Sequence, residues 1–338
     1  MMVERISRSK FLPYFFLFIL LAAFCTYYYH ETITWFPKGM HAWTQSDRFA
    51  IALKFLENGF DLFHPATYNL KVKEGITQVD FPIHEYLIAI LMKIFETKDP
   101  FVFRIYILVY SIVSLFFLFQ LAKNITGSYF KAYIAVLFLF TVPVYCYNQA
   151  GFIPSVPSFS NSIIAVYFFY KYRQIPHLKH FVLCVIFFTL AGLSRQPFTL
   201  FLIALLVTQF IKNIKYTRAF TPPIIYCIVG LAVIAGYNIY NRHLAVVYGS
   251  LFLMSPISID SMEMFREIIK AIEVRWVTEY FTVFHYMLFA TTFVFLFIGH
   301  KKIIQHIKQQ KEWFVFLSVS FLGSVFYFFI NGFQFIDH

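Results

Sequence analysis

Residues 102–122 read VFRIYILVYSIVSLFFLFQLA, an apolar run interrupted by a single charged side chain, Arg104. A helix needs about 20 mostly apolar residues to span the hydrocarbon core of a bilayer. Similar runs recur along the 338-residue chain, which is 59% hydrophobic and only 13% charged, whereas soluble domains carry about 25% charged residues. The 47 Phe and 23 Tyr side chains could not all be buried in one water-soluble core. We therefore predict an all-α, multi-pass integral membrane protein.

The apolar runs predict about nine spans, of which the first is Phe11–Tyr29. The others lie near 102–122, 130–149, 158–172, 180–195, 198–211, 221–240, 282–299 and 313–331. Arg5, Arg8 and Lys10 precede the first run, and no small-residue cleavage site follows it. The first run is therefore predicted to be an uncleaved span rather than a signal peptide, with its N-terminus in the cytoplasm.

The distribution of charge agrees with this topology. In the nine-span arrangement the inner connections are rich in Lys and Arg, and only Glu4 and Glu312 of the 17 acidic residues lie inside. Basic residues concentrate on the cytoplasmic side of membrane proteins. The net charge of +11 is thus explained by orientation, and no nucleic-acid partner is expected. The four cysteines lie within apolar runs without metal-ligand spacing, which indicates small apolar packing residues.

Polar and acidic residues gather in two predicted outer regions. The first, 31–100, carries nine acidic residues and two expected apolar-faced helices, Asp47–Asn58 and Pro82–Phe95. The expected division of the chain is 1–30 (N-terminal end and first span), 31–100 (catalytic outer loop), 101–240 (bundle), 241–281 (second large outer loop) and 282–338 (last two spans). Because the chain stops soon after a span, we expect a truncated C-terminus.

The first outer region also contains two sequence motifs. Trp43-Thr-Gln-Ser-Asp47 opens it, and Asp80-Phe-Pro-Ile-His-Glu-Tyr86 closes it. These resemble the Trp-Arg-Gln-Ala-Asp-like and Glu-Phe-Pro-x-x-x-Tyr-like segments of membrane glycosyltransferases of the dolichyl-phosphate-mannose protein mannosyltransferase type, glycosyltransferase family 39. Thr44 replaces Arg in the first motif, and Asp80 replaces Glu in the second. The resemblance implies a GT-C-like helical bundle.

The resemblance also implies a reaction and a site. Such enzymes bind a polyprenyl-phosphate sugar in a cavity facing away from the cytoplasm, and an acidic residue early in the first outer loop is the catalytic base. Asp47 is the matching position. A carboxylate within hydrogen-bond reach can accept the proton of an attacking hydroxyl. Asp80 is a second catalytic candidate that would position the acceptor or bind a divalent metal; the sequence itself identifies no metal site.

Each carboxylate also has a simpler explanation. Asp is a favoured N-cap residue, so Asp47 could cap the amphipathic helix that follows it, and that role is compatible with catalysis. Asp80 could be a solvated loop acid in front of a Pro turn.

A polyprenyl phosphate needs fixed cations. Arg195 lies in Gly192-Leu-Ser-Arg-Gln-Pro197, a break between two apolar runs. An arginine within a membrane segment costs about 2.5–3.5 kcal/mol on insertion scales, and its fork-shaped guanidinium suits phosphate. Snorkelling to the interface is the alternative explanation. Arg48, Arg242 and His84 are further candidates for substrate binding.

These features favour a glycosyltransferase, expected to be inverting, that moves a hexose or pentose to a cell-envelope glycan, lipid or protein on the outer face of a bacterial inner membrane. A transporter or flippase would show internal repeats and polar residues at mid-membrane, which this sequence does not suggest. A lipid-linked glycan polymerase usually has its key loop late in the chain. Both remain alternatives.

Overall fold

The computed structural model describes residues 11–214, 221–251, 257–299, 305 and 309–332. The described chain is helical almost throughout. Its helices are α2 (Leu12–Tyr29), α3 (Ala42–Glu57), η1 (Lys73–Gly75), α4 (Ile83–Ile94), α5 (Pro100–Thr126), α6 (Tyr129–Phe140), α7 (Pro143–Gln149), α8 (Ser155–Gln174), α9 (Leu178–Ser194), η2 (Gln196–Phe198), α10 (Thr199–Ile214), α11 (Pro222–Tyr248), α12 (Met262–Ala271), η3 (Ile272–Tyr280), α13 (Val283–Ile298) and α15 (Lys311–Ile330). The predicted all-α membrane bundle is confirmed.

Every predicted span contains a helix, but fewer pass a test of length and apolarity. Five described helices are long and apolar enough to cross a membrane, or six if α6 and α7, bent by 76°, form one broken span. The number is below the expected nine for physical reasons. α9 and α13 have only 17 and 16 residues, and α8 carries polar side chains that it buries, among them Ser158 and Asn161.

Local sequence chemistry sets the helix ends. Asp99 caps α5 by accepting a hydrogen bond from the backbone N–H of Phe101, and Pro100 occupies the first helical turn, where its missing N–H costs nothing. α5 ends at Gly127, whose φ of 71° lies in the left-handed region that glycine adopts without strain. Ser128 then caps α6, so a two-residue turn reverses the chain.

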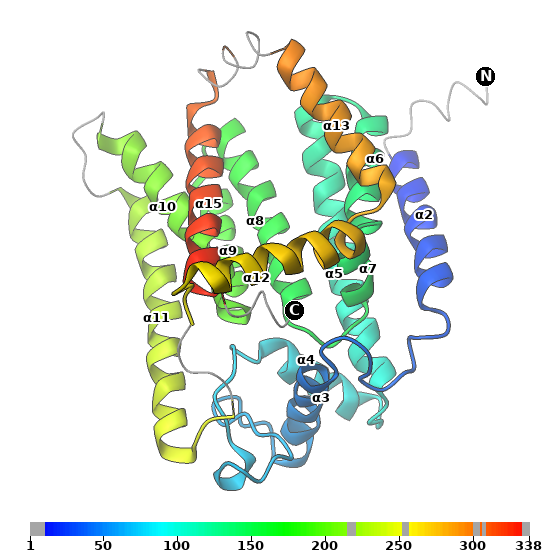
Figure 1. Cartoon of the computed structure of the whole chain (residues 1–338), viewed down its shortest axis with the longest axis vertical. Coiled ribbons are helices and arrows are strands. Elements are labelled where there is room, and N and C mark those ends of the chain that lie inside the picture. Colours follow the sequence, from blue (N-terminus) through cyan, green and yellow to red (C-terminus); the bar gives the residue numbers. More distant parts are fainter. Residues whose placement is uncertain (1–10, 215–220, 252–256, 300–304, 306–308, 333–338) are drawn as a thin grey trace.

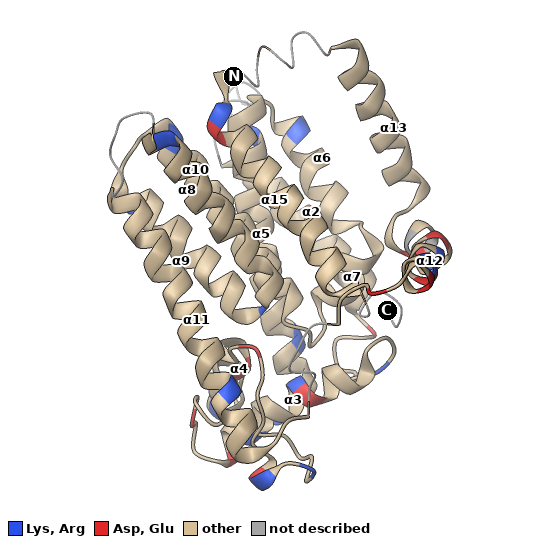
Figure 2. Ribbon diagram, turned by 60° about the vertical axis from the view of Figure 1, so that its left-hand side comes forward, with Lys and Arg blue, Asp and Glu red and all other residues tan. Residues whose placement is uncertain are grey.

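The helices form a bundle with a separate cap at one end. In Figure 1 the helices of the bundle run largely along the long axis, α3 and α4 lie together at the lower end, and α12 crosses the bundle. The largest core cluster joins α8, α9, α10, α11 and α15. Cys184 and Cys227 are buried in it as free thiols, in agreement with a packing role. Charged residues lie near the two ends of the bundle and on α12 (Figure 2).

Long-range hydrogen bonds hold the cap, residues 31–94, against the bundle. Arg104 donates to the carbonyls of Trp35 (2.7 Å) and Ala150 (2.6 Å), which ties the segment after α2 to α5. The C-terminal half of α11 extends past the bundle beside the cap (Figure 1), where the Tyr240 hydroxyl donates to the carbonyl of Phe63 at 2.7 Å. The cap is therefore attached at two opposite sides.

Two expected boundaries change in the structure. The first cap helix begins at Ala42 rather than at Asp47, and its N-cap residue is His41 with φ of 55°. The explanation of Asp47 as a helix cap is therefore wrong, because Asp47 lies in the second turn. The region 241–281, expected as a loop, contains the end of α11, the amphipathic α12 and η3.

The predicted orientation depends partly on residues outside the described ranges. Basic residues at 1–10, 215–220, 300–304 and 306–308 are among them. The cytoplasmic N-terminus stays a prediction.

Candidate active site

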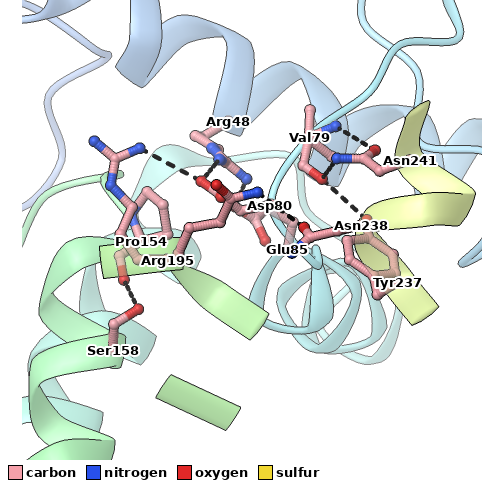
Figure 3. Close-up of polar contacts among 11 residues, drawn as sticks. Arg48, Val79, Asp80, Glu85, Pro154, Ser158, Arg195, Tyr237, Asn238 and Asn241 are labelled. Atoms are coloured by element: carbon pink, nitrogen blue, oxygen red, sulfur yellow. Dashed lines mark hydrogen bonds and ion pairs between the residues drawn. The ribbon is translucent and has the colours of Figure 1, made fainter. Parts of the chain in front are cut away.

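Asp80 lies where the cap meets the bundle, and the flanking backbone is held from both sides (Figure 3). Asn241 on α11 accepts from the backbone N–H of Val79 at 3.1 Å and donates to the Val79 carbonyl at 2.9 Å. The Tyr237 hydroxyl donates to the same carbonyl at 3.0 Å. On the other side, the N–H of Phe81 donates to the carbonyl of Leu193 at 2.9 Å. α9 and α11 thus fix the position of Asp80.

Arg48 links this segment to the two cap helices. From α3, its Nη2 lies 2.9 Å from Asp80 Oδ2, and its Nη1 lies 3.2 Å from Glu85 Oε1 on α4. The Arg48 side chain is only 8% exposed. Burial opposes its charge, but Glu85 and Asp80 outweigh that effect and hold the pKa of Arg48 above its ordinary value. A buried arginine with two carboxylate partners is a rigid anchor.

Arg195 reaches the same carboxylate from the end of α9. Its Nη1 lies 3.4 Å from Asp80 Oδ2, and its side chain is 41% exposed. The structure therefore brings together three residues that the sequence singled out, Arg48, Asp80 and Arg195, although 147 positions separate the first from the last. We call Arg48, Asp80, Glu85 and Arg195 the outer cluster, after the face to which the sequence-based topology assigns this end of the bundle.

Asp47 precedes Arg48 on α3 and has a different environment. It is half-buried, and among the residues that the structure describes its carboxylate has no hydrogen bond or ion pair. Partial burial raises the pKa of Asp47, against the influence of the Arg48 charge. A carboxylate with a raised pKa and free oxygens is a stronger base than an ordinary aspartate at neutral pH.

His84 is buried rather than open to solvent. Its Nδ1 lies 3.0 Å from the Tyr106 hydroxyl, its ring meets Tyr110 edge-on at 5.0 Å, and its Nε2 has no hydrogen-bond partner within the described part of the chain. Burial, followed by the charge of Arg48, lowers the pKa of His84 to about 4. The imidazole is therefore neutral at physiological pH. Its predicted role in substrate binding stays a prediction.

An apolar groove runs from this histidine along α5. It has a volume of about 500 Å³, and its lining comes from α4, α5, α8 and α9. Leu91, Tyr106, Tyr110, Phe117, Ile164 and Phe187 are among the lining residues. Since Tyr106 also contacts His84, the residue before Glu85, the groove and the outer cluster are neighbours.

Arg242 does not join the outer cluster. It is exposed on α11, next to Asn241, and makes no hydrogen bond or ion pair with another described residue. Its predicted substrate contact stays a prediction.

The arrangement does not suit a divalent metal at Asp80. The described ranges contain no group of three His, Cys, Asp or Glu residues that could hold one. Two guanidinium groups already contact Oδ2 of Asp80, and their positive charge disfavours a second cation beside this carboxylate.

Three residues of the site were not selected from the sequence: Glu85, Tyr237 and Asn241. For Glu85 a signal existed, because it precedes Ile88, Ala89 and Met92 at helical spacing, and all four are buried on one face of α4. A carboxylate in such a stripe needs a partner. Tyr237 and Asn241 carry no comparable signal, since they lie one turn apart on a helix that reads as a membrane span.

One of the comparisons with known proteins found a match. Residues 80–240 match the model of the family described as dolichyl-phosphate-mannose-protein mannosyltransferase. The match begins at Asp80 and includes Arg195 and Tyr237, whereas Asp47 and Arg48 lie before it. No curated protein and no solved structure matches the chain significantly. The expected resemblance is thus confirmed over residues 80–240, just under half of the chain, which include the second motif but not the first. The similarity to this family indicates a membrane glycosyltransferase that uses a lipid-linked sugar.

Proposed function

We propose that this protein transfers a monosaccharide from a polyprenyl-phosphate carrier to a glycan, lipid or protein acceptor on the outer face of the membrane. The observation that carries this proposal is the position of the outer cluster beside the apolar groove. The groove offers a surface for a prenyl chain, and the cluster offers a guanidinium with solvent access, Arg195, for a phosphate. A lipid phosphate has the same two parts.

Arg195 is the group that would meet the phosphate. Arg48 is occupied by Asp80 and Glu85, whereas Arg195 has one long contact and a partly exposed side chain. A guanidinium donates two parallel N–H bonds to a phosphate. It would neutralise the charge that develops on the phosphate as the sugar leaves.

Asp47 is the proposed base. As the acceptor hydroxyl attacks the anomeric carbon, its proton passes to the Asp47 carboxylate, the new C–O bond forms, and the bond to the phosphate oxygen breaks. The polyprenyl phosphate leaves with the bonding electron pair. A single displacement of this kind inverts the anomeric configuration. The unpaired state of Asp47 supports this role, because no internal cation has to be removed before the carboxylate accepts a proton.

The test is sugar transfer in membranes from radiolabelled polyprenyl-phosphate sugars, with wild type and Asp47→Asn compared at matched expression. We expect transfer to fall about 10²–10⁴-fold, the usual contribution of a general base, while the donor still binds. The acidic limb of the wild-type pH profile should lie above about 3.9, the ordinary Asp value, because burial raises the pKa of Asp47.

Glu96→Gln is the matched control. Glu96 is an exposed carboxylate between α4 and α5 whose side chain makes no hydrogen bond with a described residue, so its loss should leave transfer unchanged. If Asp47→Asn transfers as well as wild type, Asp47 is not the base. If wild type transfers from no common donor, the transporter and polymerase alternatives gain.

A further inference from the structure

The two arginines that share Asp80 hold it very unequally. Both contact the same oxygen, Oδ2, Arg48 at 2.9 Å and Arg195 at 3.4 Å. Arg48 has a second partner in Glu85, and its side chain is 8% exposed, whereas Asp80 is the sole ion-pair partner of Arg195 among the described residues and 41% of the Arg195 side chain is exposed. One arginine is therefore an anchor, and the other is weakly attached.

The backbone around Arg195 lets the side chain leave without a change in fold. Its N–H donates to the carbonyl of Ala191 at 3.0 Å, and its carbonyl accepts from the N–H of Phe198 at 3.1 Å. Its φ of −158° is ordinary extended backbone. Only side-chain torsions need to change for the guanidinium to move away from Asp80.

We propose that Arg195 exchanges Asp80 for the phosphate of the lipid carrier, so that Asp80 competes with the phosphate and limits its affinity. This inference rests on the proposed function. The ion pair between Arg195 and Asp80 is long, monodentate and partly solvated, so it contributes little, and a phosphate offers the guanidinium two short charge-assisted bonds instead. Asp80 keeps Arg48 after the exchange, so its charge is never left unpaired.

The charges of the outer cluster make this exchange reversible. At rest, two guanidinium groups balance two carboxylates. When Arg195 turns to a phosphate, Arg48 is the only guanidinium of the cluster that still faces Asp80 and Glu85. These three side chains together carry one excess negative charge. That charge repels a bound phosphate and draws Arg195 back. Asp80 thus favours release of the polyprenyl phosphate after transfer.

The experiment measures binding of farnesyl phosphate, a short polyprenyl phosphate, to the purified full chain by calorimetry. Farnesol and inorganic phosphate, titrated separately, distinguish binding of the tail from binding of the phosphate. Asp80→Asn should bind farnesyl phosphate about 3- to 10-fold more tightly than wild type and farnesol equally well. Arg195→Gln should bind farnesyl phosphate about tenfold more weakly.

The double variant Asp80→Asn with Arg195→Gln decides the mechanism. If Asp80 acts through Arg195, the double variant binds like Arg195→Gln alone. A gain in affinity that persists without Arg195, or no gain in Asp80→Asn, would overturn the proposal. Asp80→Glu keeps the carboxylate and should bind like wild type.

A structure of wild type with farnesyl phosphate tests the exchange without a substitution, should Asp80→Asn not fold. Arg195 must then contact the phosphate and lie beyond hydrogen-bond distance of Asp80, while Arg48 stays in place. An intact contact between Arg195 and Asp80 beside a bound phosphate refutes the exchange. If wild type binds farnesyl phosphate no better than farnesol, the proposed lipid-phosphate donor fails together with this inference. If wild type binds farnesyl phosphate more tightly than farnesol but Asp80→Asn has the same affinity as wild type, this inference fails and the proposed function stands.

Discussion

Charged clusters occur at both ends of the bundle, and they are built differently. In the outer cluster, Arg48 is almost fully buried between Asp80 and Glu85. The second cluster, which we call the inner cluster, consists of Arg173 on α8, Lys212 on α10 and Glu312 on α15. Glu312 lies 3.3 Å from Arg173 Nε and 3.2 Å from Lys212 Nζ. Its members are partly exposed, and cations outnumber acids.

The difference indicates different roles. The ion pairs of the inner cluster are partly solvated, so water can reach the charge that remains when one partner is lost. These pairs link the ends of α8 and α10 to the start of α15. A buried arginine that loses a carboxylate partner retains a costly charge. A buried arginine with carboxylate partners is therefore expected where it positions reacting groups. The outer cluster fits this expectation because it adjoins the apolar groove.

Removal of Glu85 should be the most damaging change to either cluster. Glu85→Gln takes one of two carboxylates from the buried Arg48, and we expect the free energy of unfolding to fall by about 3–5 kcal/mol. SDS titration in mixed micelles measures this loss. Glu57→Gln is the control, because Glu57 pairs with Lys54 and Lys98 on the surface of the same cap. A loss below about 1 kcal/mol for Glu85→Gln would remove the distinction between a buried and a surface cluster.

Acid should weaken the cap next to the outer cluster through His84. Its folded-state pKa of about 4 lies below the unfolded value of about 6.5, so the unfolded chain binds a proton first as the pH falls. The contribution of neutral His84 to the free energy of unfolding is therefore fully present above pH 6.5 and declines as the pH falls to about 4. The total loss expected over this range is roughly 3 kcal/mol.

Unfolding of wild type and His84→Phe in detergent between pH 7 and pH 4 measures this contribution. The phenylalanine ring cannot be protonated, so the variant should show a flatter pH dependence. His243→Gln, at an exposed position on α11, should follow wild type. Parallel curves for wild type and His84→Phe would show that the imidazole is hydrated in the folded state.

Glu312→Gln should have the smallest effect. Both ion pairs of the inner cluster lie in partly solvated surroundings, so we expect a loss of about 0–1 kcal/mol and unchanged sugar transfer. The same mixed-micelle titration and the transfer assay measure it. A loss as large as that of Glu85→Gln would mean that the two clusters do not differ in kind.

Some features of the site were predictable because they depend on short segments. Asp80 and Arg195 each lie at a break between apolar runs. Charged residues close to the membrane are costly, so their presence there indicates a functional role. Glu85 was predictable in principle from the apolar stripe around it. In contrast, the selection of Arg48 as an arginine of the first outer region did not indicate that its side chain would be buried between two carboxylates.

The sequence by itself determined that this chain forms membrane helices, because a long apolar run in a bilayer must satisfy its backbone hydrogen bonds within one helix. It also determined that the acidic residues lie between the long apolar runs and not within them, because an unpaired charge in the hydrocarbon core is costly. Only the tertiary structure decided which charges meet. Asn241 bonds the backbone of Val79, the residue before Asp80, from 162 positions away along the chain. Asp80 itself pairs with Arg195, 115 positions away. Such contacts depend on how α9 and α11 pack, and no local pattern encodes that packing.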